Sequence, residues 1–187
     1  MKVILIGGQK RAGKDYSAKV LQEMLAEQGY TSKTLSFAAP LKEIAANTLN
    51  ISLETLDDRK NNYDQLTTDG MDYREFLQRL GTEGLRNTFG DDIFVRYTQN
   101  EIYKYMDDEI DFVIIPDFRF FDEYRGMLLF DIVTLKIETN IENTDTHASE
   151  TGLVDFKFDY IIDNSQKNPD ILRDYLQSFI EIKLSQN

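Results

Sequence analysis

The sequence predicts an α/β protein with a mostly parallel five-stranded sheet covered by helices on both faces. Short apolar runs alternate along the 187-residue chain with longer segments whose apolar residues recur at helical spacing. Such alternation is typical of parallel sheets, whose strands are joined by helices that cover both faces. The length suits one substantial core, so we expect a single domain, residues 1–187, in which any second lobe is an insertion.

The first strands and helices are expected in the N-terminal quarter of the chain. Residues 2–6, KVILI, form an apolar run that ends at two glycines, as a buried strand before a tight turn does. Apolar residues recur at helical spacing from 15 to 28, and Gly29 can end that helix. A second strand is expected at 33–37, and a helix at 41–49 that follows a proline.

The rest of the chain continues the alternation. Asp72, followed by Glu75, predicts a capped start for a long helix at 73–89. We then expect a helix from about 91 to 106, strands at 111–117, 131–137 and 158–164, and helices at 120–130 and 169–183. Two polar stretches, 52–72 and 139–153, are expected to lack a packed core of their own and to act as mobile segments that close over ligands.

Composition excludes several classes of function. Acidic residues outnumber basic ones by 33 to 21, and the net charge of −12 opposes binding to nucleic-acid polymers. No apolar run nears the ~20 residues that span a bilayer, so we expect no membrane partner. Because the chain contains no cysteine, disulfides and thiolate catalysis are excluded. With no export signal, this composition predicts a cytoplasmic location.

Residues 7–15, GGQKRAGKD, carry the clearest functional signal. Gly8, four further residues, Gly13 and Lys14 match the G-x-x-x-x-G-K pattern of a Walker A phosphate loop. Glycines let backbone N–H groups surround a phosphate, and the pattern lies between a predicted strand and a predicted helix, as this mechanism requires. The alternative is a glycine-rich turn with an exposed lysine. The predicted ATP-binding residues are Gly8, Lys10, Arg11, Ala12, Gly13, Lys14, Asp15 and Tyr16.

Asp15 occupies the position at which a serine or threonine usually binds magnesium. A carboxylate is also a hard oxygen ligand that suits Mg²⁺, so Asp15 is the candidate metal ligand. The alternative is a cap that interacts with the helix dipole. A metal role requires Mg²⁺ and the neighbouring Lys10, Arg11 and Lys14 to offset the added negative charge.

Four later blocks extend the pattern: SFAAPLKE at 36–43, REFLQRLGTEGLR at 74–86, PDFRFFDE at 116–123 and HASE at 147–150. With the Gly-Lys-Asp loop, their order over about residues 1–165 resembles the bacteriophage deoxynucleoside monophosphate kinases, P-loop enzymes of the nucleoside monophosphate kinase group. The resemblance implies a three-layer P-loop NTPase fold with a helical dNMP-binding insertion and a short lid. It implies transfer of the γ-phosphoryl of ATP to a deoxynucleoside 5′-monophosphate with Mg²⁺, in the host cytoplasm if the chain is phage-encoded.

Phosphoryl transfer requires cations from several segments to neutralise the moving group. Arg119 and Asp117 lie past the expected third strand, at the edge where parallel sheets gather ligands. Arg119 can bind a phosphate or form a surface ion pair. Asp117 can hold magnesium through water, contact the deoxynucleotide or cap a helix. The catalytic candidates are Lys14, Asp15 and Arg119.

Further substrate contacts are expected from the second and third blocks. Phe37 can stack on a base or pack in the core, and Lys42 can meet a phosphate. Arg74 and Gln78 share one helix face, with a break expected at Gly81, and Gln78 can read a base. A solvated helix face is the alternative explanation for these arginines. The full predicted substrate set is Ser36, Phe37, Lys42, Arg74, Gln78, Gly81, Thr82, Arg86, Asp117 and Arg119.

The chain departs from the family in its lid, which commonly carries arginine, because residues 138–156 contain no lysine or arginine. Either Arg11, Arg119 or Arg125 compensates, or the lid only excludes water. His147 is the single histidine, which rules out a His-based metal cluster and favours a structural role. Two other functions stay open: a kinase for another phosphorylated metabolite such as phosphomevalonate, and a non-catalytic ATP-binding protein. The sequence determines neither the base preference nor the oligomeric state, and a homodimer stays open.

Overall fold

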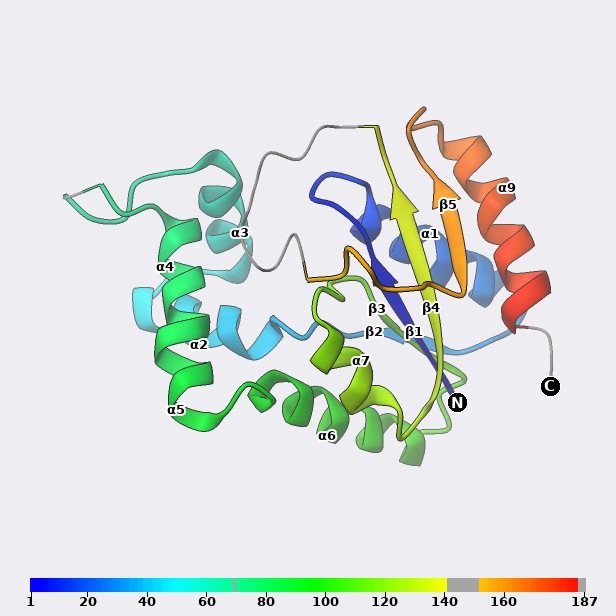
Figure 1. Ribbon diagram of the computed structural model, residues 1–187, viewed down its shortest axis with the longest axis horizontal. Coiled ribbons are helices and arrows are strands. Elements are labelled where there is room, and N and C mark those ends of the chain that lie inside the picture. The colour runs from blue at the N-terminus through cyan, green and yellow to red at the C-terminus, as the bar shows by residue number, and fades with distance from the viewer. Residues whose placement is uncertain (69, 141–151, 185–187) are drawn as a thin grey trace. The chain divides into compact units, whose positions relative to one another are not determined.

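The computed structural model describes residues 1–68, 70–140 and 152–184 (Figure 1). In chain order the elements are β1 (Lys2–Gly7), α1 (Lys14–Glu27), β2 (Ser32–Thr34), α2 (Ala39–Leu49), α3 (Leu53–Asn62), α4 (Tyr73–Arg79), α5 (Asn87–Phe89), α6 (Ile93–Asp107), β3 (Phe112–Ile115), α7 (Phe121–Met127), β4 (Asp131–Glu138), β5 (Tyr160–Asp163) and α9 (Pro169–Phe179). The chain forms two compact units, Met1–Ser36 with Thr98–Asn187, and Phe37–Tyr97.

The first unit is built on a five-stranded sheet in the order β2-β3-β1-β4-β5. Every neighbouring pair is parallel, so the predicted parallel sheet is confirmed. The central strand, β1, pairs with β3 on one side and β4 on the other. Residues 3–6 of β1 are all fully buried although their side chains alternate between the two faces. Both faces of the sheet are therefore covered.

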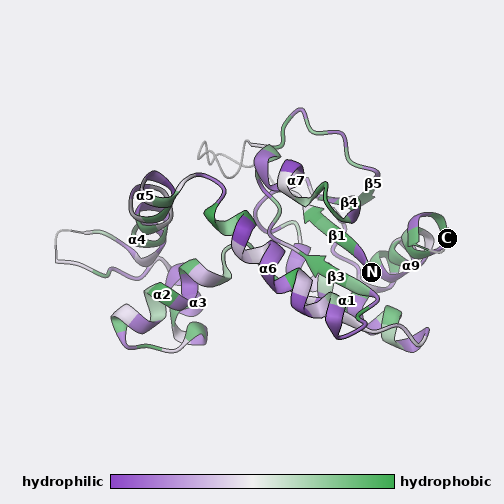
Figure 2. Ribbon diagram, turned by 90° about the horizontal axis from the view of Figure 1, so that it is seen from below, coloured by the Kyte–Doolittle hydropathy of each residue, from purple (hydrophilic) through white to green (hydrophobic). Residues whose placement is uncertain are grey.

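Helices supply the two outer layers of this unit. Leu21 and Leu25 of α1 share an apolar core with Ile4 and Ile6 of β1 and with Leu176 of α9. In Figure 1, α1 lies behind the sheet and α7 lies in front of it. Figure 2 shows β1 and β3 as hydrophobic, whereas α1 carries both hydrophobic and hydrophilic residues, as a helix covering a sheet does. The predicted three-layer α/β architecture is confirmed.

The second unit corrects the expectation that residues 52–72 have no packed core. Residues 53–62 form α3, whose N-terminus is capped by Ser52: its Oγ accepts the Thr55 N–H at 3.0 Å. Leu56 of this helix is fully buried in a cluster with Ala45, Ala46, Tyr73 and Leu77. The expectation was wrong because α3 buries a single leucine, and one apolar residue gives no visible helical repeat in the sequence. The role of residues 52–72 in closing over a ligand stays a prediction.

The long helix predicted at 73–89 forms with a change of geometry in its middle. Asp72 caps it, since its Oδ1 accepts the Glu75 N–H at 2.7 Å. Between α4 and α5, residues Leu80–Arg86 form a π-helical segment rather than the break expected at Gly81. Gly81 is buried, and a Cβ there would approach Leu41 Cδ2 to 3.1 Å. Packing against α2 therefore favours glycine at this widened turn.

Strand ends and the last helix also differ from expectation. The strands expected at 33–37 and 111–117 end earlier, at Thr34 and Ile115, and the residues beyond them form turns at the sheet edge. Helix α9 is followed by a π-helical turn at Ile180–Leu184. Within the part of the chain that the structure describes, no helix has the length and apolar character to cross a membrane.

Candidate active site

The glycine loop predicted to bind phosphate joins β1 to α1. Gly8, Arg11 and Gly13 have positive φ angles of 138°, 64° and 98°. A Cβ on Gly8 would lie 2.2 Å from the carbonyl oxygen of Ile137 in β4, so the close approach of the two backbones requires glycine there. Lys14 is only 8% exposed, and its Nζ donates hydrogen bonds to the carbonyl oxygens of Gly8 and Gln9, both at 2.8 Å. The lysine ammonium is thus held against the loop backbone.

Helix α1 begins directly after this loop. Its N-cap residue, Gly13, forms no side-chain cap hydrogen bond, so backbone N–H groups of the first turn are left to face an anion. The helix dipole adds partial positive charge at the same end. The loop, Lys14 and the helix N-terminus therefore combine three features that stabilise a bound phosphate.

The carboxylate of Asp15 is exposed in the first turn of α1. It forms no hydrogen bond or ion pair within the described part of the chain, so only the helix dipole supports a capping role. Among the described residues no cluster of three or more metal-ligating side chains occurs. A single carboxylate beside a phosphate loop nevertheless fits Mg²⁺, which is commonly held by one or two carboxylates together with phosphate oxygens and water.

A cavity of about 240 Å³ lies beside the phosphate loop. The loop side contributes Arg11, Ala12, Gly13 and Tyr16, and the segment after β5 contributes Asn164, Lys167, Asn168, Pro169 and Leu172. The Nδ2 of Asn164 donates to the Ala12 carbonyl oxygen at 2.9 Å. Sequence reasoning missed the residues after β5. Their signal was a polar cluster directly after an apolar strand, at the edge where parallel sheets gather ligands.

Ser36 and Asp117 lie close together at the carboxyl edge of the sheet. They follow β2 and β3, which are neighbours, and Ser36 Oγ donates to Asp117 Oδ2 at 2.7 Å. Arg119, half-buried, lies in the same turn, where Glu123 accepts the backbone N–H groups of Arg119 and Phe120 at 2.8 and 3.0 Å. Glu123 is 4% exposed. This buried carboxylate, which sequence reasoning missed, fixes the backbone of the turn that carries Arg119.

The remaining predicted substrate residues lie in the second unit. Phe37 is buried, which agrees with the alternative of core packing. Arg74 and Gln78 are half-buried on α4, Gly81 is buried and Thr82 is exposed. The guanidinium of Arg86 lies 5.0 Å from the ring centroid of Phe94 and donates to the Asp91 carbonyl at 3.2 Å. Contact of these residues with a substrate stays a prediction.

Lys42, predicted to meet a phosphate, is paired with an acid. Its Nζ lies 3.0 Å from Asp57, and Lys60 lies 2.7 Å from the same carboxylate. Burial alone would raise the pKa of Asp57, but hydrogen bonds and charge from Lys60 and Lys42 outweigh it and lower that pKa. The charge of Lys42 is therefore partly neutralised within its own unit.

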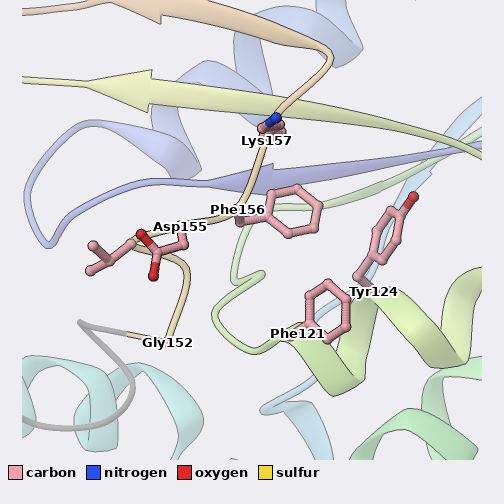
Figure 3. Close-up of a pocket in the computed structure, with 7 residues that line it drawn as sticks. Phe121, Tyr124, Gly152, Asp155, Phe156 and Lys157 are labelled. Carbon is pink, nitrogen blue, oxygen red and sulfur yellow. The ribbon is translucent and has the colours of Figure 1, made fainter.

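A second cavity, of about 550 Å³, is lined by Phe121, Tyr124, Gly152, Val154, Asp155, Phe156 and Lys157 (Figure 3). The ring of Phe156 packs edge-to-face on Tyr124 and on the fully buried Phe118, with centroids 5.0 and 5.1 Å apart. This packing ties the turn of Asp117 and Arg119 to the segment before β5.

Lys157 is the first basic residue after the stretch 138–156. Most of the predicted lid, with His147 and the block 147–150, lies outside the described residues.

Comparison with known proteins places the chain in a family. The family described as "Deoxynucleotide monophosphate kinase" matches residues 65–173. No curated protein sequence matches significantly. Solved structures that are similar include a mutant APS kinase of Mycobacterium tuberculosis, with 13% identity, 98% of each chain covered and a TM-score of 0.49. Since the family match covers more than half of the 187 residues, the chain belongs to the deoxynucleotide monophosphate kinase family.

Proposed function

We propose that this protein transfers the γ-phosphoryl of ATP to a deoxynucleoside 5′-monophosphate, giving ADP and the deoxynucleoside diphosphate. The observation that carries the proposal is the phosphate loop with Lys14 held against it, in a chain of this family. Transfer of a phosphoryl group depends mainly on positioning and on neutralising the charge of the moving group. The acceptor oxygen is expected to attack in line, with no covalent enzyme intermediate.

The ATP site is proposed around the loop. The polyphosphate would lie at the N-terminus of α1, where Lys14 can exchange the Gly8 and Gln9 carbonyls for β- and γ-phosphate oxygens. The adenine ring fits the cavity of about 240 Å³ beside the loop, where Tyr16, Pro169 and Leu172 supply apolar surface. When bound, Mg²⁺ would neutralise phosphate charge, and Asp15 is the residue of this chain proposed to hold it.

The acceptor site is proposed at the carboxyl edge of β2 and β3. Arg119 would bind the acceptor phosphate, and Asp117, positioned by Ser36, would contact the deoxynucleotide. Contacts with the substrate by Arg74, Gln78, Thr82 and Arg86, and closure over the substrates by segments 52–72 and 139–153, are further parts of the proposal. Under this proposal the whole chain works as one kinase domain. Arg11, Arg119, Arg125 and Lys157 are the candidates for the cation that the lid lacks.

An acceptor screen tests the proposal. ADP release is measured with magnesium and ATP on the four common dNMPs and on modified pyrimidine dNMPs, with ribonucleotides and phosphomevalonate as comparison acceptors. We expect turnover with at least one dNMP and little with the comparison acceptors. Lys14→Ala is the negative control and should lose turnover, because the charge bridging the phosphates is gone. Failure of every dNMP would contradict the proposal, and tight ATP binding without any turnover would indicate a binding protein.

We also propose the partners and the location of the protein. The net charge of −12 supports nucleotides rather than nucleic-acid polymers as partners. We propose that the protein has no membrane partner, because no apolar run of the sequence nears the ~20 residues that span a bilayer. We propose a cytoplasmic location, with which the absence of cysteine agrees, and the host cytoplasm if the chain is phage-encoded. Size-exclusion chromatography with light scattering would decide between a monomer and a homodimer.

A further inference from the structure

We infer that Asn164 is a positioning residue for the phosphate loop, and that it sets the orientation of the peptide between Ala12 and Gly13. The inference rests on the proposed use of this loop for ATP. It concerns a residue that lies 152 positions from the loop in the sequence and that no part of the Walker A pattern contains.

Asn164 is held in place by its own backbone. It directly follows β5, and its N–H donates to the Glu138 carbonyl at the end of β4 at 2.9 Å. Its carbonyl oxygen accepts the Lys167 N–H at 3.1 Å. The residue is only 9% exposed, and its side-chain amide donates to the Ala12 carbonyl at 2.9 Å. The amide is therefore a fixed group that the sheet presents to the loop.

The contact determines the direction of a loop N–H. In a planar trans peptide the C=O and the following N–H point in opposite directions. Because the Ala12 carbonyl points toward Asn164, the Gly13 N–H points away from it. Gly13 also makes room for the amide: a Cβ at this residue would lie 2.8 Å from Asn164 Nδ2, and its φ of +98° disfavours any other residue.

A loop that binds phosphate through backbone N–H groups gains affinity when those groups are already oriented. If the Ala12 carbonyl loses its partner, the peptide can rotate, and ATP binding must then restore the binding conformation. Loss of one neutral hydrogen bond of this kind corresponds to a roughly five- to tenfold loss of affinity. A carboxylate in place of the Asn164 amide would repel the Ala12 carbonyl oxygen and should lower the affinity for ATP further.

Asn164→Asp is the sharpest test, because it keeps the shape of the side chain and replaces the donor by an oxygen facing the Ala12 carbonyl. We expect the Kd for ATP, measured by calorimetry without an acceptor, to rise at least about tenfold. The KM for the dNMP should stay within about twofold, because in this unit the acceptor residues lie at another part of the sheet edge. Asn164→Ala should give a smaller rise, of about fivefold.

The matched control is Gln99→Glu. Gln99 Nε2 donates to the Gly126 carbonyl at 2.7 Å, which is the same kind of contact within the same unit but away from the loop. It should lower the stability without changing the Kd for ATP. An ATP Kd in Asn164→Asp within twofold of the unaltered chain, or an equal rise in Gln99→Glu, would overturn the inference. If Asn164→Asp does not fold, Asn164→Ala decides by the same criteria. If the unaltered chain binds no ATP, the loop assignment fails as well.

Discussion

At the scale of single residues, Asp15 is where the chain differs most from an ordinary Walker A loop. Its carboxylate is exposed in the first turn of α1, and it has no hydrogen-bond partner within the described residues. A cap that acts through hydrogen bonds is therefore not what this residue provides. Only the helix dipole and a bound cation remain to explain an acid beside a polyphosphate site.

Asp15→Asn should separate these two roles. Loss of the carboxylate removes a charged Mg²⁺ ligand, so we expect the Mg²⁺ concentration for half-maximal turnover to rise by about tenfold. A purely dipolar role predicts instead a loss of about 0.3–1 kcal/mol of stability with no change in Mg²⁺ dependence. Magnesium titrations and urea unfolding distinguish the outcomes. Asp122→Asn is the control, since Asp122 is also an exposed acid at the second residue of a helix, α7.

Asp57 shows how charge and burial compete at one residue. Its pKa is lowered below the ordinary 3.8 because Lys60 and Lys42 outweigh the effect of burial. A carboxyl whose pKa is lower in the folded state stabilises the fold above its unfolded pKa, and this contribution is lost as the pH falls through the folded value. The side chains are partly exposed, at 30% for Lys42 and 39% for Asp57, so solvent screens the pair.

Asp57→Asn should therefore lower the free energy of unfolding by no more than about 1 kcal/mol near neutral pH. The difference from the unaltered chain should shrink as the pH falls from 3.8 through the lower pKa of the folded state, because the Asp57 carboxyl then becomes protonated and is as uncharged as asparagine. Urea unfolding at a series of pH values measures it. The matched control is Asp58→Asn, at an exposed residue of the same helix that accepts a hydrogen bond from Asn62; it should lower the free energy of unfolding by less than Asp57→Asn does near neutral pH. A difference that stays constant with pH would contradict the assignment.

At the scale of elements, α3 shows why a helix can escape prediction. Its sequence, LETLDDRKNN, is mostly charged or polar, and only one of its two leucines is buried. What stabilises the helix is the Ser52 cap and the packing of Leu56 between α2 and α4. Tertiary contact supplies most of the stability of short helices. The long helix after Asp72 was predictable because its cap and apolar residues are both visible in the sequence.

Leu56→Ala should lower the free energy of unfolding of the second unit by about 2–5 kcal/mol, because a fully buried leucine leaves a cavity. The matched change on the same helix is Leu53→Ala, at a residue 46% exposed, which should stay within about 0.5 kcal/mol. Urea unfolding followed by circular dichroism measures both variants. Equal effects at the two positions would show that α3 does not pack as described.

At the scale of the whole molecule, the charge is strongly negative while the basic residues of the loop are local. Acids exceed bases by 33 to 21, yet Lys10, Arg11 and Lys14 lie within five residues. A long polyanion interacts with the charge averaged over the surface, whereas a nucleotide interacts mainly with the charges at its binding site. We therefore expect the chain to bind a small anion and to repel a polymeric one.

This charge distribution predicts the absence of measurable DNA binding. Fluorescence anisotropy with a labelled duplex at about 50 mM salt should give a Kd weaker than about 10⁻⁴ M, because DNA binding requires lysines and arginines that neutralise several backbone phosphates at once. ATP should bind under the same conditions, which serves as the positive control. Micromolar DNA binding that weakens steeply with salt would contradict this prediction and would point to a basic surface elsewhere.

The sequence by itself determined the parts of this protein that are local in the chain. The apolar runs, the helix caps and the segment from Gly8 to Tyr16 are contiguous patterns, and the α/β class and the phosphate loop followed from them.

Tertiary structure decided what depends on contacts between distant residues. The strands end where their pairing ends, at Thr34 and Ile115. Asn164 contacts the glycine loop only because folding brings it there, since it lies 152 residues from Ala12. A hydrogen bond across that separation leaves no periodic signal in a sequence, so only the folded chain could reveal it.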